Sequence, residues 1–162
     1  MLDAQRCSLI RQKLTLARQL LRLASETWSS NTSLTNEALL QGSVTLIDEG
    51  RCLMLGLVAQ TFQVDGFEGH RLGDLIAVLG ERNAEVELLR GLASESGSWW
   101  QRLDSLVEHQ QNPRPAKSPG ESEGLIAVAA SSEPERSAEA LGGLIDEFRA
   151  YLESFTERYE QW

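Results

Sequence analysis

Apolar residues recur along the start of the chain with the period of an α-helix. The series, at steps of four and three, is Ile10, Leu14, Ala17, Leu21, Ala24 and Trp28. This spacing predicts a helix over about residues 3–28, with Asp3 as its N-cap. Leu9, Leu16, Leu20 and Leu23 widen the apolar stripe to nearly half of the helix surface. We therefore expect this helix to contact more than one neighbour.

A second helix is predicted after the polar stretch at residues 29–33. Its apolar series is Leu40, Val44, Ile47, Met54, Val58 and Phe62. The helix should cover about residues 34–62 and be roughly 40 Å long, at about 1.5 Å per residue. Because a short turn joins two long amphipathic helices, we expect them to form an antiparallel hairpin.

The middle of the chain predicts shorter helices. Residues 63–71 are typical of a loop, and a third helical stretch covers about residues 72–93. Gly80 inside that stretch is expected to kink or split it. Ser98 and Gln101 fit a capping box, which predicts a short helix that ends before Pro113.

The last part of the chain predicts a linker and a final helix. Residues 113–124 contain three prolines and indicate a flexible linker, and the short apolar run at 125–130 favours an extended segment over the start of a helix. Ser132 and Glu135 fit a capping box with Pro134 in the first turn. The apolar series of this helix is Leu141, Ile145, Phe148, Leu152, Phe155, Tyr159 and Trp162.

These elements predict an all-α protein, an up-down helical bundle of four to five helices. The long N-terminal antiparallel hairpin belongs to a bundle core over residues 1–112, and a flexible linker follows at 113–124. Residues 125–162 supply the apolar segment and a C-terminal helix that packs back on the bundle. The whole chain is expected to be a single domain.

Charge and composition exclude several classes of partner. The net charge is −9 and the isoelectric point about 4.7, which argues against nucleic acid and against anionic membranes. No apolar run approaches the length of a membrane span, and the N-terminus lacks a secretory pattern. Cys7 and Cys52 are isolated and predicted to fill the core. We interpret the protein as cytoplasmic.

No catalytic, metal or cofactor motif emerges from the residue pattern. Two histidines and two separate cysteines do not make a zinc or di-iron set, so no metal is predicted. Gly142 and Gly143 lie inside the predicted last helix rather than in a phosphate-binding loop, and no cofactor is predicted. Whether a small molecule binds stays open.

One spacing resembles an enzyme signature. Arg102 and His109 are seven residues apart, so both lie on one face of the predicted helix. HEPN-type helical ribonucleases carry an arginine, four to six residues and then a histidine, and these two side chains act on the RNA phosphate. The alternative is an ordinary solvated arginine and a surface histidine, which the acidity of the chain favours.

Two further groups are binding candidates. Arg11, Arg18 and Arg22 flank the apolar stripe of the first helix, where they would bind an anionic partner or pair with the acidic last helix. Trp99 and Trp100 are adjacent, and successive helical side chains diverge by about 100°. One of them is therefore expected to be partly exposed for binding, unless each packs against a different neighbour.

Taken over nearly its full length, the chain resembles an uncharacterised gammaproteobacterial family of small helical proteins of unknown function. The resemblance rests on Arg11-Gln-Lys-Leu-Thr-Leu-Ala17, Ala38-Leu-Leu-Gln41, the proline-bearing linker, Leu125-Ile-Ala-Val128 and the acidic final helix. It implies no activity and no site residues.

The function hypothesis is a non-enzymatic helical interaction or regulatory module. Its partner would be another protein or a second copy of the chain. The alternatives are a HEPN-like ribonuclease that uses Arg102 and His109, and a helical sensor with an apolar small-molecule pocket.

Overall fold

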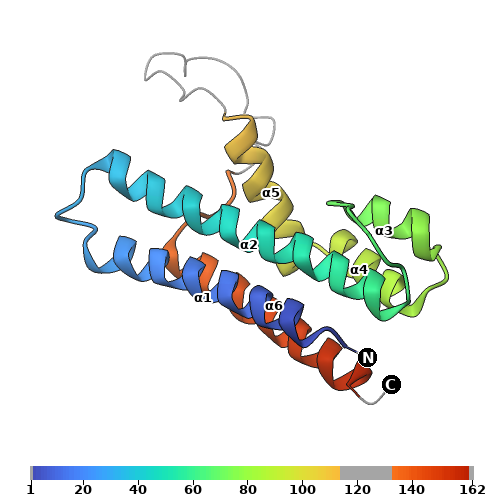
Figure 1. Ribbon diagram of the computed structural model, residues 1–162. Coiled ribbons are helices and arrows are strands. Elements are labelled where there is room, and N and C mark those ends of the chain that lie inside the picture. Colours follow the sequence, from blue (N-terminus) through green and yellow to red (C-terminus); the bar gives the residue numbers. More distant parts are fainter. Residues whose placement is uncertain (1, 114–132, 161–162) are drawn as a thin grey trace, which may run out of the picture.

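The computed structural model describes residues 2–113 and 133–160, and this part of the chain is all α-helical (Figure 1). Its six helices are α1 (Ala4–Glu26), α2 (Ser33–Thr61), α3 (Leu72–Leu79), α4 (Ala84–Ser94), α5 (Trp99–Gln111) and α6 (Ala138–Tyr159). The predicted linker lies almost entirely outside the described residues, as do the run Leu125–Ala130 and Trp162.

Side chains at the N-caps set where several helices begin. The Asp3 carboxylate accepts a hydrogen bond from the backbone N–H of Arg6 at 3.0 Å, which confirms the predicted cap of α1. Ser98 caps α5 as predicted, since its Oγ lies 3.1 Å from the backbone nitrogen of Gln101. The Gln101 side chain bonds back to the N–H of Gly97 rather than Ser98, so the box is shifted by one residue.

The predicted count of four to five helices is wrong by at least one, because the third stretch is two helices. Gly80 ends α3 with φ 81°, a left-handed conformation that side chains other than glycine rarely adopt. Asn83 then starts α4, where its side chain accepts from the N–H groups of Glu85 and Val86. The expectation of a kink or split at Gly80 is confirmed as a split.

The start of the last helix is also corrected. Residues 133–137 are not helical, and Ser137 rather than Ser132 is the N-cap, accepting from the N–H of Ala140 at 3.1 Å. Just before this cap, Arg136 forms an ion pair with Glu37 of α2. This ion pair holds Arg136 against α2 immediately before α6 begins.

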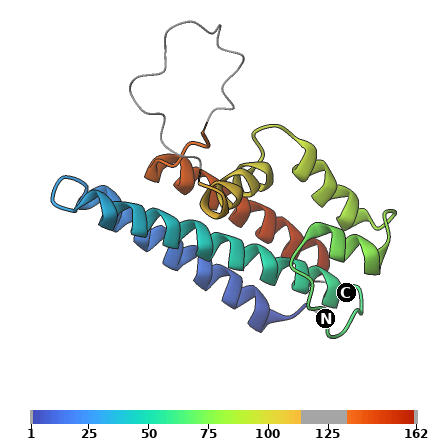
Figure 2. The same ribbon diagram turned by 90° about the horizontal axis from the view of Figure 1, so that it is seen from above.

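The three long helices form one group, in which each helix packs against the other two, and the short helices lie against this group. α1 and α2 are the predicted antiparallel hairpin, and α6 packs against both, running antiparallel to α1 (Figures 1 and 2). α5 lies across α2 and α6, while α3 and α4 pack on one another and reach α2 and α5, respectively.

Apolar side chains from all six helices fill the space between these helices. The inner side of α1 contributes Cys7, Ile10, Leu14, Ala17, Leu21 and Ala24, all buried, which are the positions that the periodicity selects. Gly50 of α2 lies where α1, α2 and α6 meet, since a Cβ added there would be in ordinary contact with Phe148 of α6 and Leu14 of α1 at 3.5 and 3.7 Å. Of the cysteines, Cys7 fills the core as predicted, whereas Cys52 is only half-buried.

Candidate functional site

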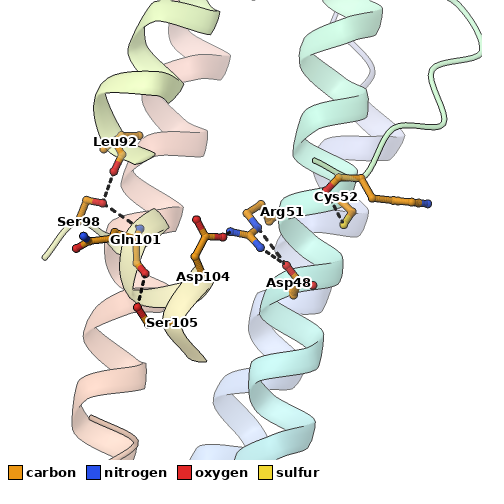
Figure 3. Close-up of polar contacts among 9 residues, drawn as sticks. Asp48, Arg51, Cys52, Leu92, Ser98, Gln101, Asp104 and Ser105 are labelled. Carbon is orange, nitrogen blue, oxygen red and sulfur yellow. Dashed lines mark hydrogen bonds and ion pairs between the residues drawn. The ribbon is translucent and has the colours of Figure 1, made fainter. Parts of the chain in front are cut away.

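A polar cleft lies between α2 and α5, beside the chain that leads into α3. It has a volume of about 500 Å³, and Arg51 is its most buried charged side chain, at 8% exposure. The Arg51 guanidinium donates to Asp48 of its own helix and to Asp104 of α5, and it lies 5.0 Å from the ring centroid of Trp100 (Figure 3). Two carboxylates and the face of an aromatic ring therefore pair with this cation.

Cys52 lines the same cleft but is not activated as a nucleophile. Its sulfur lies 3.8 Å from the backbone oxygen of His70 (Figure 3). Burial, and next the nearby Asp48 carboxylate, raise the pKa of this thiol above its ordinary value. Reactive cysteines need the opposite shift, since the thiolate is the nucleophile. The raised pKa therefore lowers the fraction of Cys52 that is thiolate at neutral pH.

A second buried charge joins α4 to α6. Glu85, in the first turn of α4, is fully buried and accepts hydrogen bonds from the Tyr151 hydroxyl at 2.6 Å and from Arg158 at 2.9 and 3.0 Å. Burial, and then the Glu85 charge, raise the pKa of Tyr151 well above its ordinary value. We interpret this cluster as a lock between two helices, since every polar group in it has a partner.

The residue periodicity carries a signal for both buried charges. Arg51 fills the gap between Ile47 and Met54 in the apolar series of α2. Glu85 lies four residues before Leu89, on the buried side of α4. A charged residue at a position reserved for apolar residues predicts a buried partner, but the partner itself comes from a distant helix.

Arg102 and His109 lie near carboxylates of different helices. The Arg102 guanidinium lies 2.5 Å from a carboxylate oxygen of Glu147 on α6. His109 is close enough to Glu37 of α2 to contribute to the lowered pKa of that carboxyl, after the hydrogen bonds from Arg136 and Gln41. Neither these contacts nor the comparisons below support the ribonuclease alternative.

The arginine flank of α1 divides between two kinds of contact. Arg18 forms an ion pair with Asp146 of α6, which is the predicted pairing with the acidic last helix. Arg22 bonds within its own helix, to Gln19 and Glu26. Arg11 is exposed and has no ion-pair partner among the described residues. An anion-binding role for the three arginines stays a prediction.

The expectation that Trp99 or Trp100 is partly exposed is wrong, because both are 3% exposed. Trp99 stacks on Phe148 of α6 with ring centroids 4.3 Å apart and nearly parallel planes. The Trp100 ring, with its centroid 5.3 Å from that of Trp99, lies under Arg51 of α2. Since α5 lies between α2 and α6, each ring has its own neighbour and the alternative arrangement holds.

The periodicity of α1 did not identify its exposed leucines as a candidate site. Leu9, Leu16 and Leu23 are 39%, 46% and 43% exposed, although they belong to the wide stripe. They are seven residues apart, nearly two turns, so they align on the side of α1 turned away from the core. We call the surface formed by Leu9, Leu16 and Leu23 with the neighbouring Gln5, Gln12 and Gln19 the outer face.

No element of the described chain covers the outer face. Among the described helices α1 packs against α2 and α6, and Figure 2 shows its other side at the edge of the molecule. Lys13 and Arg18 of α1 lie toward those two neighbours, in the pairs Lys13–Glu49 and Arg18–Asp146, whereas Arg22 donates to Gln19 on the edge of the outer face. The outer face itself is therefore a row of leucines beside uncharged glutamines.

In residues 2–113 and 133–160 we find a closed helical bundle with two satisfied buried charges, and no cluster of three metal-ligating side chains. No described helix is long and apolar enough to cross a bilayer. The chain belongs to a family of unknown function, DUF6586, whose model matches residues 5–162. This confirms the resemblance to such a family. No curated protein and no solved structure matches the chain.

Proposed function

We propose that this protein is a non-enzymatic interaction module that binds another protein surface through the outer face of α1. One observation carries the proposal: three leucines at heptad spacing, each about two-fifths exposed, on a helix whose other side is completely packed. Core leucines in this chain are buried to 4% or less on the same helix. A solvent-facing heptad of leucine is typical of a helix that packs against a further helix.

The buried charges support this proposal over catalysis. In the cleft, the Arg51 guanidinium is bound by two carboxylates. The Glu85 carboxylate is fully buried against Tyr151 and Arg158, so both buried charges are already engaged within the protein. Catalytic groups need a free position beside them for the substrate. Two unpaired cysteines fit a reducing compartment, which supports a location in the cytoplasm.

Labelling of engineered cysteines in intact cells tests whether the outer face is covered. Leu16→Cys is compared with Leu88→Cys on α4, a matched control because Leu88 is 49% exposed and Leu16 46%. A membrane-permeant maleimide should label position 16 more slowly in cells than in dilute purified protein, with no such difference at position 88. Mass spectrometry reads each site separately, so Cys7 and Cys52 do not interfere.

Equal labelling of position 16 in cells and in dilute solution would show that nothing covers the outer face. That result would overturn the interaction module as proposed here. Protection at both positions would also contradict it, because the protected surface would then not be specific to α1.

A further inference from the structure

We infer that the occupant of the outer face is a second copy of this chain, with the two α1 helices antiparallel about a two-fold axis at Leu16. This inference rests on the proposed interaction module and names its partner. Three features of the outer face point to it: the symmetry of the leucine spacing, the chemistry of the neighbouring glutamines and the absence of acidic residues.

The leucine spacing is symmetric about Leu16. Leu9 precedes it by seven residues and Leu23 follows it by seven, and Leu16 is the most exposed of the three. A two-fold axis at Leu16 therefore places Leu16 against its own copy and Leu9 against Leu23 of the partner subunit, at both ends. Each copy then uses the same patch, as closed two-fold dimers do.

The glutamines are self-complementary in this arrangement. Gln12 and Gln19 lie on one edge of the leucine stripe, four residues before and three residues after Leu16. The axis brings Gln12 of one copy to within about one residue, roughly 1.5 Å along the helix, of Gln19 of the partner subunit. Gln19 already accepts from Arg22 at 3.1 Å, which leaves its amide N–H groups to donate to the carbonyl of Gln12.

Charge permits a second copy at the outer face. The chain carries a net charge of −9, so most of its surface repels an identical molecule. From Gln5 to Leu23 the chain has no acidic residue, and the cations beside the outer face are paired, Lys13 with Glu49 and Arg22 with Gln19 and Glu26. Two copies can therefore meet on this surface without contact between acidic side chains. The centres of protein interfaces are depleted in charged residues in the same way.

The size of the surface sets the strength of the dimer. α1 has 23 residues and is about 34 Å long, and the contact would involve three leucines and two glutamines from each copy, a small interface for a specific complex. The dimer is therefore concentration-dependent. Light scattering over a dilution series of the full chain should show monomer at low concentration and dimer at high concentration.

Disulfide trapping in the purified full chain tests the register. With mild oxidation at high concentration, Leu16→Cys should form a covalent dimer by itself, because the two positions meet on the axis. Leu9→Cys and Leu23→Cys should each stay monomeric alone and cross-link when mixed. Leu88→Cys and the unsubstituted chain, which retains Cys7 and Cys52, are the controls and should not cross-link.

Two results would overturn the inference. Homodimers of all three single variants would show parallel helices, and no cross-link at any of the three positions would show that the second copy is not the occupant. If position 16 is nevertheless protected in cells, the interaction module holds with a different partner. If position 16 is unprotected as well, both proposals fail.

A charged substitution gives a second measurement that does not depend on cysteine chemistry. Leu16→Glu places two carboxylates against each other on the axis and should weaken the dimer by about tenfold or more. Leu88→Glu is the matched control and should leave the dimer unchanged. Circular dichroism checks that both variants keep their helix content, as expected for exposed positions.

Discussion

The group of long helices and the group of short helices are held in place by different interactions. α1, α2 and α6 meet mainly through apolar side chains such as Leu14, Ile47 and Phe148, and their ion pairs lie at the exposed edges. The short helices bury apolar residues too, but α4 and α5 also contact the long helices through the buried charges at Glu85 and Arg51.

This difference bears on how the position of each helix is specified. Long helices present enough apolar surface for packing alone to select their neighbours, since each buried leucine contributes about 1.5–3 kcal/mol. A short helix such as α4, with 11 residues, buries few side chains and could slide against α6 at little cost. A buried charge with a single hydrogen-bonded arrangement removes that freedom, because any other position leaves it without a partner.

The largest effect on the free energy of unfolding is expected in the core between the long helices. Leu14→Ala should lower the free energy of unfolding by about 2–5 kcal/mol, because it leaves a cavity in a fully packed site. Leu16→Ala, on the same helix but on the outer face, should change it by less than about 0.5 kcal/mol. Urea unfolding at low protein concentration measures both. Equal losses would mean that the outer face is part of the core.

A smaller and more local effect is expected at the lock between α4 and α6. Glu85→Gln keeps the shape but loses the charge that Arg158 and Tyr151 contact, which should cost about 1–3 kcal/mol. Hydrogen exchange should speed up in α4 more than in α1. Glu87→Gln, an exposed change in the same turn, is the control. Uniform acceleration over all helices would contradict a local lock.

The smallest effect at neutral pH is expected at Tyr151, because this residue lowers the stability of the folded protein only in alkaline solution. The pKa of Tyr151 is raised in the folded protein, first by burial and then by Glu85. The unfolded chain releases this proton near pH 10, whereas the folded protein retains it, so stability falls as the pH rises above about 10. Tyr151→Phe should reduce this alkaline loss, measured as the change in thermal midpoint between pH 8 and pH 11. An equal loss in both proteins would place the alkaline sensitivity elsewhere.

The amino-acid sequence by itself determined the helices, most of their ends and the hairpin. Asp3, Ser98 and Gly80 act within a few residues of themselves, and the apolar series of α1 marks its buried side. Local hydrogen bonds and the period of the helix depend on neighbouring residues alone, so they can be read along the chain.

Only the tertiary structure decided which apolar and charged side chains find a partner. Leu16 and Leu14 are the same residue on the same helix, yet one is 46% exposed and the other is fully buried. Trp99 and Trp100 are both buried because α5 happens to have a neighbour on each side. Arg51 and Glu85 are paired by residues more than fifty positions away. Whether a side chain is buried depends on the elements that surround it, and the apolar period of one helix carries no information about those neighbours.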